Sequence, residues 1–194
     1  VAARTMNAFR LEAEDMPRIV DVMAQSFSKS DLNLENFSAA MANAGTAAAT
    51  VGLSLEDTTS MIATLVDGFI PAAKAGTDVR VILQALNEEG LSLNEAFSIV
   101  EQSTDKLGTA TELVGRRAAA ALILLSGSRP KLLDLSMAFL DAGGKAKVMA
   151  SIMDDTLVGD LFKVVSAAEG VAIAMSEHLE PSLRKIAQEA GAFL

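Results

Sequence analysis

The chain has 194 residues, enough for one substantial domain or for one domain with a helical extension, and a chain of this size buries about 70% of its unfolded surface. Its 16 basic and 25 acidic residues give a formal net charge of -9, which opposes attraction to a phosphate backbone and argues against nucleic-acid binding. Hydrophobic residues make up 51% of the chain but aromatic residues only 4%, and the lack of cysteine excludes disulfides, thiolate metal ligands and cysteine nucleophiles.

Apolar residues recur at helical spacing along the whole chain, whereas the alternating pattern of strands is nearly absent, so the sequence predicts an all-α protein. The first clear helix should begin at Asp15, with Pro17 just inside it, and end between Ser28 and Asp31. Its apolar face is expected to contain Ile19, Val20, Met23 and Phe27.

Two helix starts with capping side chains follow. Asn33 is placed to cap a helix that Gly52 should end. Its apolar residues are Phe37, Met41, Ala44, Ala48 and Val51. Ser54 should cap the next helix with its hydroxyl, while Asp57, three residues on, reaches back. The apolar face of that helix is expected to contain Ile62, Leu65, Val66 and Phe69.

Gly68 and Pro71 break the helical pattern, and Gly76 with Thr77 should begin the next helix, which Gly90 ends. The inward residues of this helix are expected to be Val79, Ile82, Leu83 and Leu86.

Ser92 and Glu95 have the spacing of a capping box. The apolar stripe behind them consists of Leu93, Ala96, Phe97 and Val100. A polar stretch around residues 104–111 should separate this array from a helix over residues 112–125, whose second half, residues 118–125, is apolar on every side. Such a stretch suits a helix that is buried on most faces or covered by a neighbouring chain, and it is far shorter than the ~20 apolar residues of a bilayer span.

Longer helical segments are expected in the second half of the chain. Residues 127–130 (Gly-Ser-Arg-Pro) form the clearest break there, and a helical pattern over residues 146–179 is followed by a bend at Pro181. We therefore expect a compact array of short amphipathic helices over residues 1–127 and a helical extension over residues 128–194 that packs on it.

The tetrapeptide Gly-Leu-Ser-Leu occurs twice, at residues 52–55 and 90–93, with a spacing of 38 residues. One interpretation is a repeated helix pair of the solenoid kind, in which each unit buries its apolar face on its neighbour. The other is that the chain uses one good capping turn twice. Two copies leave both interpretations open.

Side chains suited to catalysis or metal binding are sparse and scattered, so the sequence predicts no enzyme, catalytic residue, cofactor or metal site. His178 is the single histidine; Glu177 and Glu180 lie near it, but a lone histidine near a helix end is more often solvated than a metal ligand. The adjacent carboxylates at residues 88–89 and 154–155 point in different directions on a helix, which does not make an acid/base pair.

Several other conspicuous residues have structural interpretations. Residues 143–145 (Gly-Gly-Lys) lack the rest of a phosphate-binding loop, so a helix-to-helix turn is expected there. Arg80 is expected to form a structural ion pair or to cap a carbonyl group. Core-filling roles are expected for Met61, Met137, Met149 and Met153.

Three stretches resemble the core region of phage tail tape-measure proteins. They are residues 33–37 (Asn-Leu-Glu-Asn-Phe) with Met41, residues 51–58 (Val-Gly-Leu-Ser-Leu-Glu-Asp-Thr) and residues 75–80 (Ala-Gly-Thr-Asp-Val-Arg). In that family a Leu-Gly-Leu-Ser-Leu-Glu-Glu-Thr type turn leads to an Ala-Gly-Thr-Ala-Leu-Arg type helix. The resemblance covers residues 1–125, and no similar motif follows it.

The resemblance implies a noncatalytic virion protein that lies in the phage tail lumen after assembly in the host cytoplasm. It implies a role in tail assembly, a length that sets the tail length, and departure from the tail during DNA ejection. The partners that it implies are tail-tube, tail-tip and tail-assembly chaperone proteins, together with self-association, and no small-molecule substrate. The chain departs from the family pattern at Asp78, where a small apolar residue is usual, and at residues 69–72 (Phe-Ile-Pro-Ala).

Two other hypotheses remain open from the sequence. One is a helical protein-interaction adaptor unrelated to phage, with residues 118–125 as its partner surface. The other is a membrane-active segment that contacts the membrane only during genome delivery, through residues 118–125 and 164–175. Because the chain starts at Val1 without an initiator methionine or a signal peptide, we expect it to be an excised segment of a larger polypeptide.

Overall fold

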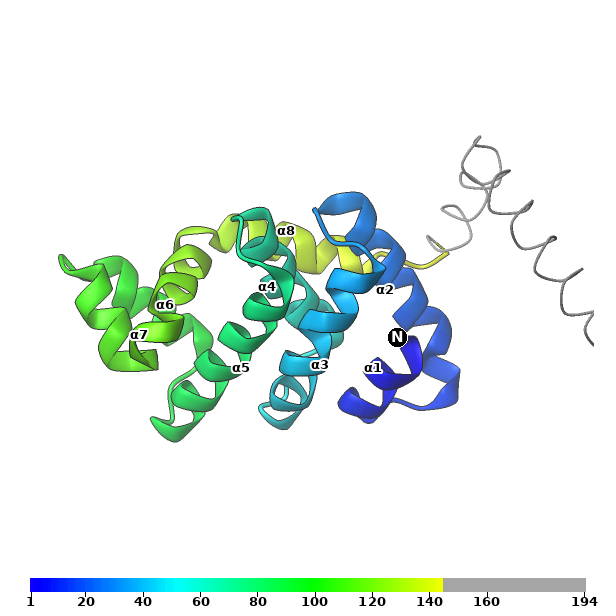
Figure 1. Cartoon of the computed structure of the whole chain (residues 1–194), viewed down its shortest axis with the longest axis horizontal. Helices are drawn as coiled ribbons and strands as arrows, with labels where there is room; N and C mark the ends of the chain where they lie inside the picture. Colours follow the sequence, from blue (N-terminus) through cyan, green and yellow to red (C-terminus); the bar gives the residue numbers. More distant parts are fainter. Residues whose placement is uncertain (145–194) are drawn as a thin grey trace, which may run out of the picture. The chain divides into compact units, whose positions relative to one another are not determined.

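The computed structural model describes residues 1–144, which form eight α-helices, one short 3-10 helix and no strand (Figure 1). The predicted all-α class is therefore confirmed. The elements are α1 (Ala2–Phe9), η1 (Ala13–Asp15), α2 (Met16–Lys29), α3 (Leu34–Thr50), α4 (Leu55–Asp67), α5 (Ala72–Glu88), α6 (Leu93–Gln102), α7 (Lys106–Gly127) and α8 (Arg129–Leu140).

The described helices pack in two layers. Helices α1, α3, α5 and α7 lie side by side in that order, and α6 packs on α7 at the end of this row (Figure 1). The second layer consists of α2, α4 and α8, each in contact with the other two. Helix α4 also contacts α3, α5 and α7 of the first layer, so it is covered from most sides.

Three predicted helix caps are confirmed. The side chain of Asn33 accepts a hydrogen bond from the backbone N–H of Asn36 at 2.8 Å, which starts α3. The hydroxyl of Ser54 accepts one from the N–H of Asp57 at 3.0 Å, which starts α4. At the start of α6, Ser92 forms the predicted capping box with its partner three residues on. These hydrogen bonds satisfy N–H groups that have no acceptor within their own helix.

The predicted start of α5 is wrong by several residues. Pro71 is its N-cap and the helix begins at Ala72, so Gly76 lies inside the helix. The glycine has a packing function there, because a Cβ atom at this position would lie 2.1 Å from the carbonyl oxygen of Ala40 on α3. A glycine at residue 76 therefore allows the backbones of α3 and α5 to approach closely.

The predicted boundaries of α7 are also wrong. The helix begins at Lys106, where Asp105 accepts a hydrogen bond from the N–H of Gly108, so most of the polar stretch is helical and does not form a linker. The helix is interrupted at Gly115, whose φ of 75° and ψ of 162° are essentially restricted to glycine. The predicted break at residues 127–130 is confirmed, since α7 ends there and α8 begins.

Three side chains predicted to lie in the core are exposed. Val20 on α2 is exposed, and Val22 occupies the core in its place. Phe69 is 94% exposed because α4 ends two residues earlier and the phenylalanine backbone turns into the left-handed region, with φ of 65°. Met137 on α8 is also exposed, whereas Met61 lies in the core as predicted.

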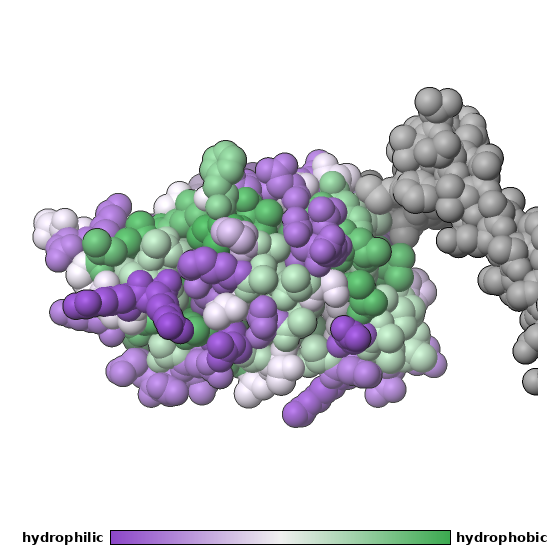
Figure 2. Space-filling view, in the orientation of Figure 1, coloured by the Kyte–Doolittle hydropathy of each residue, from purple (hydrophilic) through white to green (hydrophobic). Residues whose placement is uncertain are grey.

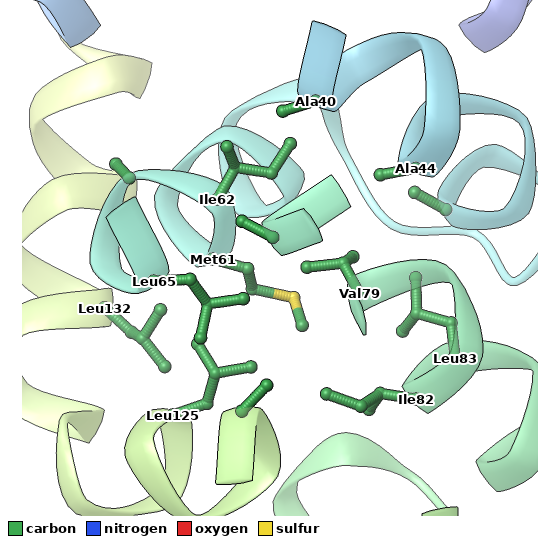
Figure 3. Close-up of a cluster of buried hydrophobic side chains, with 14 of the residues drawn as sticks. Ala40, Ala44, Met61, Ile62, Leu65, Val79, Ile82, Leu83, Leu125 and Leu132 are labelled. Carbon is green, nitrogen blue, oxygen red and sulfur yellow. The ribbon is translucent and has the colours of Figure 1, made fainter. Parts of the chain in front are cut away.

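The buried core is mostly aliphatic, with a few phenylalanines, and is continuous across both layers. Figure 3 shows a part of it in which side chains from five helices converge. The labelled residues are Ala40 and Ala44 of α3, Met61, Ile62 and Leu65 of α4, Val79, Ile82 and Leu83 of α5, Leu125 of α7 and Leu132 of α8. Alanines on α3 keep this helix close to α5, while leucines and isoleucines fill the wider spaces around α4.

The two Gly-Leu-Ser-Leu segments form the same turn. Gly52 and Gly90 have φ of 78° and 67°, and the residue after each donates its N–H to a carbonyl group in the last turn of the preceding helix. Helices α3 and α5, which precede the turns, stack as units of a solenoid would. In the second layer, however, the main contact of α4 is with α8, whereas α6 packs mainly on α7. The arrangement therefore favours one capping turn used twice over a continuing repeat.

Helix α8 lies within the predicted extension and contacts α2 and α4. After α8 the backbone N–H of Gly144 donates a hydrogen bond to a carboxylate oxygen of Asp21 on α2 at 2.8 Å. Residues 145–194 lie outside the described residues, so the division of the chain into residues 1–127 and 128–194 stays a prediction.

Candidate interaction groove

A groove of about 480 Å³ lies between the two Gly-Leu-Ser-Leu turns and α8. It is within the range of about 300–1,000 Å³ that is usual for ligand sites. Its lining is mostly apolar and comes from α4, α5, α6, α8 and both turns. The lining residues are Val51, Leu53, Asp57, Ser60, Met61, Leu83, Leu86, Asn87, Leu91, Ser92, Leu93, Asn94, Phe97, Leu132, Leu133 and Ser136.

The groove follows from the way in which the second layer is built. In a regular stack of helix pairs, α6 would pack on α4 and the two turns would be covered. Here α6 packs mainly on α7, and α8 takes the main place beside α4, so a space remains between α4 and α6. The leucines after the two turn glycines, Leu53 and Leu91, both line this space.

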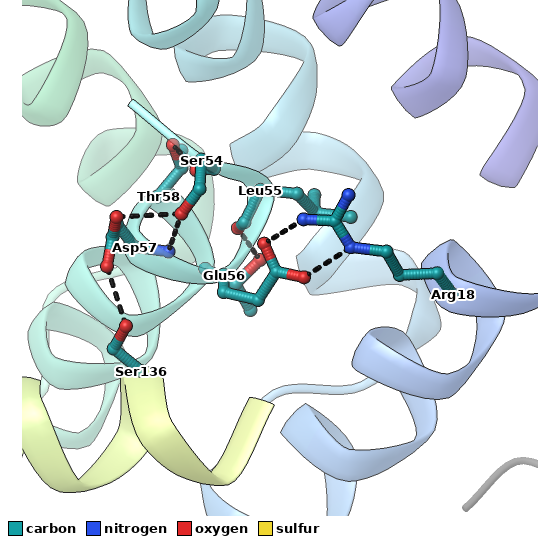
Figure 4. Close-up of polar contacts among 8 residues, drawn as sticks. Arg18, Ser54, Leu55, Glu56, Asp57, Thr58 and Ser136 are labelled. Carbon is teal, nitrogen blue, oxygen red and sulfur yellow. Dashed lines mark hydrogen bonds and ion pairs between the residues drawn. The ribbon is translucent and has the colours of Figure 1, made fainter. Parts of the chain in front are cut away.

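Hydrogen bonds hold α8 as one wall of the groove. The hydroxyl of Ser136 donates to Asp57 Oδ1 at 2.6 Å, and the hydroxyl of Ser54 donates to Oδ2 of the same carboxylate at 2.7 Å (Figure 4). The predicted reach of Asp57 back to Ser54 is confirmed, and the same side chain joins α4 to α8. No local pattern in the sequence marks Ser136 as a partner of Asp57, since the two residues are 79 positions apart.

The first residue of α8 fixes the helix to α6. The guanidinium group of Arg129 donates to the carboxylate of Glu101 at 3.1 Å and to the backbone and side-chain oxygens of Asn94. It also lies over the ring of Phe97, 5.6 Å from the ring centre. Together with the link to α4, these contacts keep the two sides of the groove apart at a defined distance.

The outer face of α8 carries an apolar stripe that is continuous with the groove. Leu133, Met137 and Leu140 are 64%, 59% and 65% exposed, and their spacing places them on one face of the helix. Leu133 also lines the groove. Other patches of apolar side chains reach the surface between polar ones on the face shown in Figure 2.

Several acidic residues are close in sequence to the residues that line the groove. Glu88 and Glu89 follow the lining residue Asn87, and Asp134 follows Leu133; all three carboxylates are exposed and have no ion-pair partner within residues 1–144. The two cations that precede the lining residues of α8 are both in ion pairs, Arg129 with Glu101 and Lys131 with Asp67 at 2.6 Å. The unpaired charges next in sequence to the lining residues are therefore negative.

A second polar contact, between Arg18 and Glu56, joins α2 to α4. Two guanidinium nitrogens of Arg18 each donate to a carboxylate oxygen of Glu56 at 2.7 Å (Figure 4). The carboxylate is 1% exposed, and the hydrogen bond that Arg18 donates to it is the main reason why the pKa of Arg18 is raised. The two hydrogen bonds from Arg18 compensate the negative charge of Glu56, which would otherwise be buried without a partner. We therefore assign this ion pair a structural role.

Several residues singled out in the sequence have different surroundings from those expected. Arg80 donates to the side-chain oxygen of Gln84 at 3.1 Å, which is neither an ion pair nor a carbonyl cap of a helix end. Within residues 118–125, five side chains are buried in the unit itself, so the partner surface that the adaptor hypothesis placed there is largely internal. Other features predicted from the sequence lie outside the described residues. They are His178 with its two glutamates, the carboxylates at 154–155, Met149, Met153, the helical pattern over residues 146–179 and the bend at Pro181.

Two further properties concern metal and membrane binding. No group of three or more histidine, aspartate and glutamate side chains within residues 1–144 could hold a metal ion. Among the helices of the same residues, none is both long and apolar enough to cross a bilayer.

Comparison with known proteins shows the family of the chain. The family model described as "Phage-related minor tail protein" matches residues 1–174 and so extends past residue 125, where the resemblance in the sequence had ended. The chain is 29% identical to the "Probable tape measure protein" of Escherichia phage P2, over 95% of the chain and 26% of that protein. It is 28% identical to the "Tape measure protein" of Pneumococcus phage Dp-1, over 95% of the chain and 18% of that protein. No solved structure matches the chain.

Proposed function

Because the chain belongs to the family of phage-related minor tail proteins and is thus a structural component of a phage tail, we propose that it is a segment of a tape-measure protein that contributes to tail assembly and tail length. The observation that carries this proposal is the similarity to two tape-measure proteins from unrelated hosts along nearly the entire chain. The chain spans about a quarter or less of the length of these relatives, so the activity of the whole protein is part of the proposal.

The described structure supports a role through helix contacts. Its side chains form a continuous hydrophobic core, and polar contacts join its helices. Arg18 joins α2 to α4, Ser136 joins α8 to α4, and Arg129 joins α8 to α6. A helical segment can contribute to a ruler because each helical residue adds ~1.5 Å of length. The proposed partners are tail-tube, tail-tip and tail-assembly chaperone proteins, and the proposed location is the tail lumen after assembly in the host cytoplasm.

The experiment that tests this role is an in-frame deletion of the 194 residues in the phage or prophage that encodes them, followed by electron microscopy of the tails. The proposal predicts tails that are shorter in proportion to the residues removed. Tails of normal length that fail to infect would assign the segment to genome delivery. Normal, infectious tails would contradict a role in tail length.

A further inference from the structure

We propose that the groove and the apolar stripe on α8 together bind an amphipathic α-helix of a partner protein, and that this partner helix carries lysine or arginine side chains beside its apolar face. The binding surface consists of the groove-lining residues and of Leu133, Met137 and Leu140. It is independent of the role in tail length, since it depends only on the surface of residues 1–144.

The shape of the surface fits a helix. Leu133 belongs to both the groove and the stripe, and Leu140 lies seven residues further along α8, a distance of ~10 Å at ~1.5 Å per residue. The apolar face of a bound helix presents side chains at positions i, i+4 and i+7 over the same distance. Such a helix can lie along α8 and place one or two large apolar side chains in the groove, over Met61 and Phe97.

The charges select a basic partner. Asp57 is the single charged residue among those that line the groove, and the exposed residues Glu88, Glu89 and Asp134 are next in sequence to lining residues or to one another. A helix with lysine or arginine beside its apolar face would pair with these groups as it binds. A second copy of this chain is disfavoured, because it brings a net charge of -9 to an acidic surface.

The test uses the full chain and two synthetic 18-residue helical peptides with the same leucine face. One peptide has lysine at all other positions and the second has glutamate. Fluorescence anisotropy with labelled peptide should show binding of the leucine–lysine peptide, and the leucine–glutamate peptide should bind at least tenfold more weakly. Equal affinity for both peptides, or no binding of the lysine peptide, would overturn the proposal.

Two sets of variants locate the binding surface. The double variant Leu133→Gln, Met137→Gln should weaken binding of the lysine peptide at least tenfold, while the matched double variant Leu34→Gln, Leu107→Gln, which changes two other exposed leucines, should not. Because all four side chains are exposed, the fold should be kept, which circular dichroism checks.

A second pair of variants tests whether the carboxylates next in sequence to the groove lining attract the lysine peptide. The triple variant Glu88→Gln, Glu89→Gln, Asp134→Asn should weaken binding several-fold. A triple variant that removes three exposed carboxylates elsewhere, Glu14→Gln, Glu35→Gln, Glu112→Gln, has the same net charge and should bind as the unchanged chain does. If both triple variants lose affinity equally, the attraction is to the net charge of the chain and the groove is not the site.

Discussion

Hydroxyl groups allow helix α4 to be buried on nearly all sides. Ten of its residues from Leu55 to Leu65 are buried, and five of these are polar: Glu56, Thr58, Thr59, Ser60 and Thr64. The hydroxyls of Thr58, Thr59 and Ser60 donate to carbonyl groups in the preceding turn at 2.7–2.8 Å. Short polar side chains that hydrogen-bond to their own helix lose little free energy on burial, so α4 can occupy the middle of the unit formed by residues 1–144.

Thr64 is the exception among these side chains, because its hydroxyl has no hydrogen-bond partner within the described residues. Thr64→Val should therefore leave the free energy of unfolding unchanged or raise it by up to ~1 kcal/mol. The control Thr59→Val removes a hydrogen bond to Leu55 and should lower that free energy by about 1 kcal/mol. Urea denaturation compares the two variants, and an equal loss in both would show that Thr64 has a partner in solution.

Phe97 should contribute strongly to stability. It is 5% exposed, lines the groove and carries the guanidinium group of Arg129 over its ring. Phe97→Ala is expected to lower the free energy of unfolding by ~3–5 kcal/mol. Ile99→Ala on the exposed side of the same helix should cost less, and chemical denaturation measures both. A loss below about 1 kcal/mol for Phe97→Ala would place this face of α6 in solvent.

At the scale of elements, the close approach of α3 and α5 depends on small side chains. Gly76→Ala would place a Cβ atom against the backbone of Ala40, and overpacking of this kind typically costs 1–3 kcal/mol. Gly127→Ala is the matched control, because no atom lies within 4 Å of the added Cβ atom; it should be neutral or stabilising by up to about 1 kcal/mol. Thermal unfolding should show a lower midpoint for Gly76→Ala, and equal midpoints would mean that the two helices can move apart freely.

The start of α6 should make stability depend on pH. Hydrogen bonds from the hydroxyl and backbone N–H of Ser92 lower the pKa of Glu95. A carboxylate with a depressed pKa in the folded state stabilises the protein above its unfolded pKa, and this contribution is lost as the pH falls through the folded value. Glu95→Gln should therefore reduce the loss of stability between neutral and acidic pH.

The control for this pH dependence is Glu89→Gln, since Glu89 is exposed and has no partner within residues 1–144. Denaturation midpoints across the acidic range should change more steeply for the control than for Glu95→Gln. Identical slopes would show that the capping box is not formed in solution.

Elements held by local chemistry could be predicted from the sequence, and those held by distant contacts could not. The caps at Asn33, Ser54 and Ser92 bind within three residues, so their side chains alone identify them. Gly76 was interpreted as a helix start because its role, the contact with α3, is tertiary. The predicted burial of Val20 and Met137 was wrong for a related reason, because helical spacing does not show which side of a wide apolar face packs against a neighbouring helix.

The groove could not be predicted in any part. Its walls come from four helices and two turns, and its existence depends on α8 packing on α4 while α6 packs mainly on α7. The sequence does contain Leu53 and Leu91 in matching positions, but the same leucines would be buried in a regular repeat. Only the arrangement of the helices leaves them open to a partner.

At the scale of the whole molecule, the described residues are a folded helical unit of a chain that belongs to the family of phage-related minor tail proteins. The two layers are closed by α8, and ion pairs join segments that are far apart in the sequence. A compact folded unit is compatible with the proposed role in tail length if the segment adds its own length to that of a longer protein. The contribution of the segment to the tail is then set by how far it is extended in the assembled tail.

Tail length in a phage whose gene for this protein carries these 194 residues twice in tandem would test the proposed role of the segment. A duplication keeps one complete copy of every partner surface, so its effect on length is not confused with loss of assembly. Electron microscopy should show tails that are longer than normal, by up to ~290 Å if every added residue is helical and extended along the tail. Tails of unchanged length would contradict the proposed role of this segment in the ruler.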